Sequence, residues 1–166
     1  MQKRELEKQF ELLVKEHELL IHKVCTIYAF TEVNRQDLFQ EIVIQLWKAF
    51  PKFKGDAKFS TWLYRVAINT AITGLRKEKN FIQSYEPEAL PIHIIDTSNS
   101  NVVEEQMLQL YAAIEKLNEI EKAIVMLYLE DKSYEDMEEI LGISQGTLRV
   151  KMTRIKDKLR QLAKNN

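Results

Sequence analysis

Apolar residues recur at every third or fourth position along most of the chain, and this spacing is typical of helices that bury one face. The first such series extends from residue 5 to residue 30 and includes Leu6, Phe10, Leu13, Val14, Leu20, Ile21, Val24, Ile27 and Tyr28. A second stripe consists of Leu38, Ile42, Leu46 and Phe50. It predicts a helix that starts beside Asn34 and Asp37, which have capping-box spacing, and that Pro51 ends because proline lacks a backbone N–H.

A third helix is predicted from about Ser60 to Lys79, with Ser60 or Thr61 as its N-cap. The loop before it contains Gly55 and Asp56, a pair typical of a turn. Residues 81–103 then change in composition, with two prolines, several Ser and Asn residues, and no Lys or Arg. A segment of this length without a helical pattern is unusual inside one compact domain. We therefore predict a flexible linker at 81–103 between one domain at 1–80 and another at 104–166.

The second domain shows the helical pattern in shorter pieces. MLQLYAAIEKL is amphipathic and EIEKAIVMLYLED is strongly apolar, so both are predicted to be helices. Farther on, Ser133 and Asp136 have capping-box spacing, and Gly142 stands where the C-cap of a helix belongs. Ser144 is placed to cap the next helix. A helix, a short turn with glycine and a second helix together predict a helix-turn-helix motif.

Composition agrees with an all-α fold of two small helical domains. Hydrophobic residues make up 45% of the 166 residues, and there are only four glycines and three prolines. The one cysteine, Cys25, excludes an internal disulfide framework and suits a reducing compartment. The N-terminus lacks the apolar segment of a signal peptide, and no apolar run approaches the roughly 18 residues of a membrane span. We therefore expect a cytoplasmic protein without membrane insertion.

The net charge is only −1, but the charges are unevenly distributed. Residues 51–80 carry seven basic and two acidic side chains, and residues 146–166 carry seven basic and one acidic. Between them, residues 104–145 carry three basic and eleven acidic side chains. Because the Debye length is about 8 Å at physiological salt, each basic block can attract a polyanion by itself. The acidic block is also suited to cover the basic 51–80 block in the free protein.

The C-terminal helix has the two faces that a DNA-recognition helix needs. Its apolar face contains Leu148, Met152, Ile155, Leu159 and Leu162. On the remaining surface, arginine and lysine side chains can reach guanine edges or phosphates, and the Val150 and Thr147 methyl groups can contact a thymine methyl. The alternative is an ordinary amphipathic helix whose charges are merely solvated.

The stretch KFSTWLYRVAIN, residues 58–69, raises a similar question. One face of the predicted helix carries Trp62, Arg65, Asn69, Thr73 and Arg76. An aromatic ring, arginines and an amide suit an unpaired base and its phosphates better than an intact duplex. The preceding loop strengthens this interpretation because it contains three lysines. Spacing alone leaves open that Trp62 belongs to the core and that Arg65 pairs with a nearby carboxylate.

Two long runs resemble a known family and favour the nucleic-acid interpretation. DLFQEIVIQLWKAFPKFKGDAKFSTWLYRVAINTAITGLRK closely resembles region 2 of bacterial RNA polymerase sigma factors of the extracytoplasmic-function (ECF) group. LNEIEKAIVMLYLEDKSYEDMEEILGISQGTLRVKMTRIKDKLR is similar to their region 4. The resemblance covers nearly the whole chain outside the linker and the extreme ends, and the two blocks stand in the family's order.

The resemblance implies roles for three sets of residues. The first matches the helix that docks on the β′ clamp helices of core RNA polymerase: Asp37, Leu38, Gln40, Glu41 and Trp47. The second matches the part that melts and reads the promoter −10 element: Phe53, Lys54, Lys58, Phe59, Trp62, Arg65, Asn69 and Arg76. The third matches the helix that reads the −35 element as duplex: Ser144, Gln145, Gly146, Thr147, Arg149, Val150, Lys151 and Arg154. Within the second set, Asn69 matches a position that helps to hold a flipped base.

The implied function is that of a promoter-specificity subunit, which is not itself an enzyme and needs no cofactor or metal. Its implied partners are promoter DNA, the β′ clamp helices and β flap of core polymerase, and an anti-sigma factor. Housekeeping sigma factors carry two adjacent tryptophans where this chain has Trp62 and Leu63, which implies weaker melting and stricter promoter choice. From the residues alone, two alternatives remain: a stand-alone helix-turn-helix regulator, and a helical module that binds a partner through its acidic faces.

Overall fold

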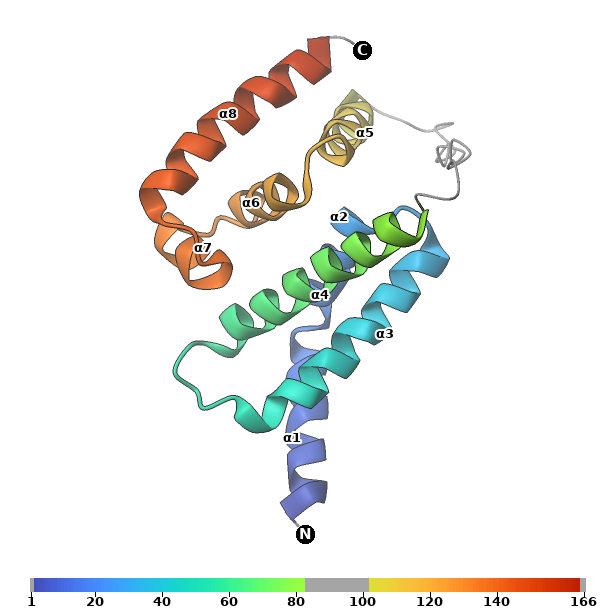
Figure 1. Ribbon diagram of the computed structural model, residues 1–166, viewed down its shortest axis with the longest axis vertical. Coiled ribbons are helices and arrows are strands. Elements are labelled where there is room, and N and C mark those ends of the chain that lie inside the picture. The colour runs from blue at the N-terminus through green and yellow to red at the C-terminus, as the bar shows by residue number, and fades with distance from the viewer. Residues whose placement is uncertain (1, 83–101, 165–166) are drawn as a thin grey trace.

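The computed structural model describes residues 2–82 and 102–164, and within these ranges all regular structure is helical (Figure 1). The helix before the gap ends at Ile82 and the next one begins at Val102. Each therefore extends two residues into the segment 81–103 that the sequence analysis assigned to a linker. Residues 83–101 of that linker lie outside the described residues.

The first apolar series is divided between two helices, α1 (Gln2–Glu16) and α2 (Glu18–Tyr28). His17 lies between them with φ −111° and ψ 15°, outside the helical range. Its backbone N–H donates to the carbonyls of both Leu13 and Val14, at 3.1 and 3.2 Å. The pattern of apolar residues gave no sign of this break, because no glycine or proline marks it and the spacing continues across it.

The next two helices begin earlier than predicted. Helix α3 (Glu32–Ala49) is capped by Thr31, whose hydroxyl accepts from the Asn34 N–H at 3.1 Å, so the predicted start beside Asn34 and Asp37 was wrong. It ends at a 3₁₀ turn, η1 (Phe50–Lys52), which contains the predicted stop, Pro51. Helix α4 (Phe59–Ile82) is already helical at Phe59. Neither Ser60 nor Thr61 is therefore its N-cap.

The C-terminal half contains α5 (Val102–Glu115), α6 (Glu119–Leu129), α7 (Tyr134–Leu141) and α8 (Gln145–Lys164). The Ser133 hydroxyl accepts from the Asp136 N–H at 3.1 Å and so caps α7 as predicted. Gly142 ends α7 in the left-handed conformation, with φ 71°. Its N–H donates to the Glu138 carbonyl at 2.8 Å, which confirms the predicted helix end and the turn of the helix-turn-helix motif.

The helices form two groups, the N-terminal unit (α1–α4) and the C-terminal unit (α5–α8). In the first, α2, α3 and α4 pack against one another around Ile21, Leu46 and Leu63, which are fully buried. In the second, α6 and α7 pack on α8, and the fully buried residues include Met137 and Leu148. The units also contact each other, because α7 packs on α4 and α6 packs on α2 (Figure 1).

Candidate nucleic-acid interface

The helix-turn-helix holds the start of α8 in a fixed orientation. Ser144 accepts from the Thr147 backbone N–H at 3.3 Å and donates its hydroxyl proton to the Thr147 hydroxyl at 2.8 Å. One turn later, Leu148 is fully buried, and Met152 and Ile155 continue the buried stripe. The predicted cap and the predicted apolar face are therefore both present. Together they fix which face of α8 is turned outward.

The outward face carries nearly all of the residues predicted to read the −35 element. Ser144, Gly146, Thr147, Arg149, Val150, Lys151 and Arg154 are exposed, and only Gln145 is partly buried. Val150 is 52% exposed, so its side chain is not part of the core of this unit. This residue is therefore available to contact an apolar group of a ligand.

Tyr134 is a neighbour of this face that the sequence analysis missed. The central carbon of the Arg149 guanidinium lies 5.1 Å from the centroid of the Tyr134 ring, within the range of a cation–π contact. Tyr134 is the first residue of α7, so the two are brought together by the turn rather than by helical spacing. Such a contact restricts the rotamers of the arginine and fixes the plane of its guanidinium group.

The predicted −10 residues form an aromatic cluster at the start of α4. The ring centroids of Phe53 and Phe59 lie 5.8 Å apart, and those of Trp62 lie 5.0 and 5.4 Å from them. All three rings are partly buried, so Trp62 belongs both to the edge of the core and to the surface. The His17 ring, 4.9 Å from that of Phe59, supports this cluster from the break between α1 and α2. No pattern in the sequence indicated this contact.

The polar −10 residues divide into free and engaged side chains. Lys54, Lys58 and Asn69 are exposed. Arg65 donates to the backbone carbonyl of Glu139 in α7, so its partner is a carbonyl and not the carboxylate considered above. Arg76 forms an ion pair with Glu119, at 3.4 Å from its Nε to a carboxylate oxygen. Fourteen residues, or about 21 Å of helix, separate Arg76 from Trp62, so this arginine does not join the aromatic cluster.

The predicted polymerase-binding residues lie on α3 in different environments. Asp37, Gln40 and Glu41 are exposed on one face. Leu38 is partly buried against the core, and the Trp47 ring lies 5.1 Å from that of Phe10. The exposed face also carries two large apolar residues that the sequence analysis missed, Val33 and Ile44, which are 67% and 46% exposed. Ile44 could have been noticed because it lies off the buried stripe of this helix.

The described residues contain no group of three or more His, Cys, Asp or Glu side chains that could hold a metal ion. No helix among them is both long and apolar enough to cross a bilayer. Cys25 is buried, and its burial raises the pKa of the thiol to about 11. This cysteine is therefore held as an unreactive thiol inside the N-terminal unit.

Two family models match the chain. Residues 13–81 match sigma-70 region 2, and residues 107–159 match sigma-70 region 4. The first match lies in the N-terminal unit and the second in the C-terminal unit. The proposed −10 face on α4 and the helix-turn-helix thus fall within different regions of one family.

Similar curated proteins include the ECF RNA polymerase sigma-E factors of Haemophilus influenzae and Escherichia coli (strain K12), each 29% identical to this chain. The alignments cover 90% of this chain and 85% of the first relative, and 91% and 84% for the second.

Two solved structures have the same fold. One is the sigma factor RpoE in complex with the anti-sigma factor NepR from Bartonella quintana, with a TM-score of 0.75 and 19% identity over 95% of this chain and 98% of that one. The other is CnrH in complex with the cytosolic domain of CnrY, with a TM-score of 0.68 and 17% identity over 96% of this chain and 90% of that one. Because both family regions occur in order and ECF sigma factors are among its relatives, the chain belongs to the sigma-70 family of RNA polymerase sigma factors, in the ECF group, and is a promoter-recognising sigma subunit.

Proposed function

We propose that this chain brings core RNA polymerase to promoters through two DNA-reading surfaces and one polymerase-binding surface. The observation that carries the proposal is the presence of two chemically different reading faces on one chain. The face of α8 is basic and suits duplex DNA, whereas the start of α4 is aromatic and amide-bearing and suits unpaired bases. Residues 1–80 and 104–166 are the proposed domains, joined by the linker at 81–103.

At the −35 element, α8 would enter the major groove with its N-terminal half. Arg149, Lys151 and Arg154 supply donors to guanine edges or phosphates, and Val150 and Thr147 supply apolar contacts. Gly146 has no side chain, so it allows the DNA backbone to approach closely. The polar residues Ser144 and Gln145 are placed at the helix N-terminus, where phosphate binding is favoured.

At the −10 element, the aromatic cluster would stack on bases that leave the duplex. Asn69 is exposed about two turns beyond Trp62 and can hydrogen-bond the edge of a flipped base. Lys54 and Lys58 of the preceding loop, together with Arg65 and Arg76, would hold the phosphates of the displaced strand. A single tryptophan at this position suggests that melting depends on the promoter sequence more than in housekeeping sigma factors.

The exposed face of α3 is the proposed contact with the β′ clamp helices. Asp37, Gln40 and Glu41 offer charged and polar groups, and Ile44 adds an exposed apolar side chain that a partner helix can bury. Leu38 and Trp47 would act chiefly by holding α3 in place, because both pack against the core. The C-terminal unit would contact the β flap.

We further propose that the chain works in the cytoplasm, where the polymerase performs RNA synthesis and this subunit supplies promoter choice. The two solved relatives are in complex with anti-sigma partners, NepR and the cytosolic domain of CnrY. An anti-sigma factor is accordingly a proposed partner of this chain.

The direct test mixes the purified chain with sigma-free bacterial core polymerase. A stable complex on size exclusion, followed by transcripts that start at defined sites in a random-sequence library, is the expected result. The library would also give the −35 and −10 sequences. Absence of a complex, together with tight duplex binding by the chain alone, would instead favour a stand-alone helix-turn-helix regulator.

A further inference from the structure

The loop between η1 and α4 is held at both ends by the N-terminal segment of the chain. Residues 53–58 form this loop without helical structure, and Gly55 within it has φ 77°. We infer that α1 and the residue that follows it, His17, fix the geometry of the loop, and that His17 is a positioning residue for the aromatic cluster at the start of α4. This inference rests on the proposed −10 function of that cluster.

The first end of the loop is held by Phe10 of α1, which is 7% exposed. The centroid of its ring lies 5.3 Å from that of Phe50, the first residue of η1, and 5.1 Å from that of Trp47 in α3. The Phe50 ring in turn lies 6.3 Å from that of Trp62. Tilted ring pairs with centroids about 4.5–7 Å apart attract each other beyond simple burial. Helix α1 therefore fixes the turn from which the loop starts.

The second end of the loop is held by His17. Its ring centroid lies 4.9 Å from that of Phe59, the first residue of α4, and the two rings are tilted by 56°. Phe10 and His17 are seven residues apart in the sequence, and Phe50 and Phe59 are nine apart. One short segment thus reaches both ends of the loop.

The His17 ring is itself fixed in place. Its Nδ1 lies 2.9 Å from the Leu13 carbonyl oxygen, and because a carbonyl only accepts, this bond places a proton on Nδ1. The backbone N–H of the same residue donates to the Leu13 and Val14 carbonyls, and its carbonyl accepts from the Leu20 N–H at 3.1 Å. The ring is therefore held by its own hydrogen bond at a junction that the backbone also fixes.

This arrangement has a consequence for bases that stack on the cluster. Phe53, Phe59 and Trp62 are only partly buried, so each has surface that a base can contact. Stacking depends on the plane that each ring presents. Without the His17 ring, Phe59 loses the neighbour that restricts its orientation, and both other rings contact Phe59. His17 can therefore affect which bases bind without contacting them.

The test uses the holoenzyme and two fluorescein-labelled DNAs, a single strand with the preferred −10 sequence and a duplex with the preferred −35 sequence. His17→Ala should weaken binding of the −10 strand by about two- to tenfold, the range expected for one aromatic contact. Binding of the −35 duplex should not change, because α8 lies in the other unit. Unchanged binding of the −10 strand would overturn the inference, as would equal weakening on both DNAs.

Two further variants separate the ring of His17 from its hydrogen bond. His17→Phe keeps a ring beside Phe59 but lacks the donor to the Leu13 carbonyl, so it should bind the −10 strand nearly as well as the wild type. His17→Asn keeps a donor placed like Nδ1 but lacks the ring, so it should bind as weakly as His17→Ala. The reverse order would assign the effect to the helix junction and overturn the inference.

Base preference gives a readout that a general loss of stability would not change. With −10 strands altered at one position at a time, His17→Ala should reduce discrimination most at the position that stacks on Phe59. An equal loss at every position would contradict a positioning function. Circular dichroism of each variant checks that it is folded.

The chain offers a matched control in His22. Its ring also packs on a phenylalanine, Phe39 of α3, with centroids 4.7 Å apart, but this pair includes no ring of the cluster. His22→Ala should therefore leave the −10 base preference unchanged. A change as large as that of His17→Ala would contradict the inference.

The same measurements distinguish this inference from the proposed function. If the wild-type holoenzyme initiates transcription and His17→Ala has wild-type −10 binding, only the positioning by His17 fails. If the wild-type chain forms no holoenzyme, the proposed function fails, and the inference that rests on it fails as well.

Discussion

The two DNA-reading faces of this molecule differ in how exposed they are and in which contacts position their side chains. The basic face of α8 is exposed, and its own unit arranges it, because Ser144 fixes Thr147 and Tyr134 lies under Arg149. The −10 face on α4 is only partly free, because Arg65 and Arg76 contact the C-terminal unit. A surface that binds duplex DNA can have its side chains in place before DNA binds. A surface that binds single strands exposes aromatic and basic side chains, and here two of the basic ones, Arg65 and Arg76, already contact another part of the chain.

The largest effect is expected from the core under the duplex-reading face. Leu148 is fully buried between α8 and the rest of the C-terminal unit, so Leu148→Ala should lower the free energy of unfolding by about 2–5 kcal/mol. Thermal unfolding would measure this loss. Leu162→Ala, near the end of the same helix where the side chain is only partly buried, should cost clearly less. Equal losses would mean that the α8 core is not centred on Leu148.

Arg154→Ala tests whether the duplex-reading face specifies bases. If Arg154 contacts a guanine edge, binding should weaken by about 1–3 kcal/mol at one −35 position only. If it contacts a phosphate, all sequences should weaken alike and the salt dependence should become shallower. Holoenzyme binding to a set of singly altered −35 duplexes distinguishes the two results. No change on any duplex would remove Arg154 from the interface.

Tyr134→Ala tests whether preparation of this face depends on the aromatic neighbour of Arg149. Loss of the cation–π contact should weaken −35 binding by about 0.5–1 kcal/mol. Tyr134→Phe keeps the ring and should retain wild-type binding, which separates the contact from any function of the hydroxyl group. Binding that is as weak in the Phe variant as in the Ala variant would assign the effect to the hydroxyl.

The contact between the units should also open at high pH. Burial raises the pKa of both Tyr28 and Tyr64 above the ordinary value, and the charges of Glu119 and Glu130, respectively, raise them further. Above about pH 10, the open form therefore loses phenolic protons that the closed form retains, and closure weakens as the pH rises. Scattering profiles at pH 8 and pH 11 should show expansion at the higher pH. Tyr28→Phe should reduce this pH effect.

Patterns within short stretches of sequence predicted where helices occur better than they predicted which parts of the chain pack together. Gly142 and Ser144 could be assigned because turn and cap chemistry lies in a few adjacent residues. The start of α3 was misplaced because Thr31 and Asn34 are both suitable N-cap residues. Only the backbone geometry shows that Thr31 is the one that caps the helix. The break at His17 depends on how α1 packs, which the periodic pattern does not encode.

The candidate sites show the same limit. Helical spacing correctly grouped the outward residues of α8, because a face depends only on periodicity. The partners of Arg65, Arg76 and Arg149 lie in other helices, 74, 43 and 15 residues away along the chain. The uneven charge distribution was the one sequence feature that anticipated the contact between the units. It could not identify the pairs, because a net charge does not say which side chains meet.

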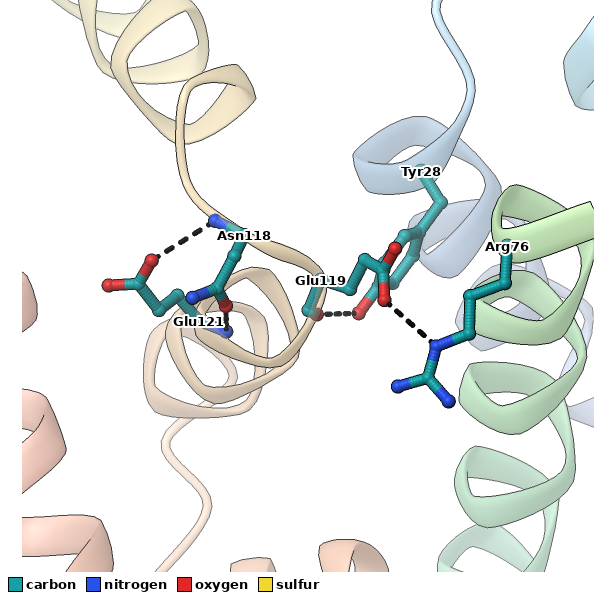
Figure 2. Close-up of polar contacts among 5 residues, drawn as sticks. All are labelled: Tyr28, Arg76, Asn118, Glu119 and Glu121. Atoms are coloured by element: carbon teal, nitrogen blue, oxygen red, sulfur yellow. Dashed lines mark hydrogen bonds and ion pairs between the residues drawn. The ribbon is translucent and has the colours of Figure 1, made fainter. Parts of the chain in front are cut away.

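The carboxylate of Glu121 connects two helices of the C-terminal unit, and this connection affects how the two DNA-reading faces can move relative to each other. It accepts from the Asn118 N–H at the start of α6 (Figure 2), and it also pairs with Lys158 of α8 at 3.1 Å. The helix end that holds Arg76 is thus tied to the recognition helix. We expect the C-terminal unit to swing away from α4 as one rigid body, carrying its duplex-reading face unchanged. Opening would then change the distance between the two DNA-reading faces but not the shape of either face.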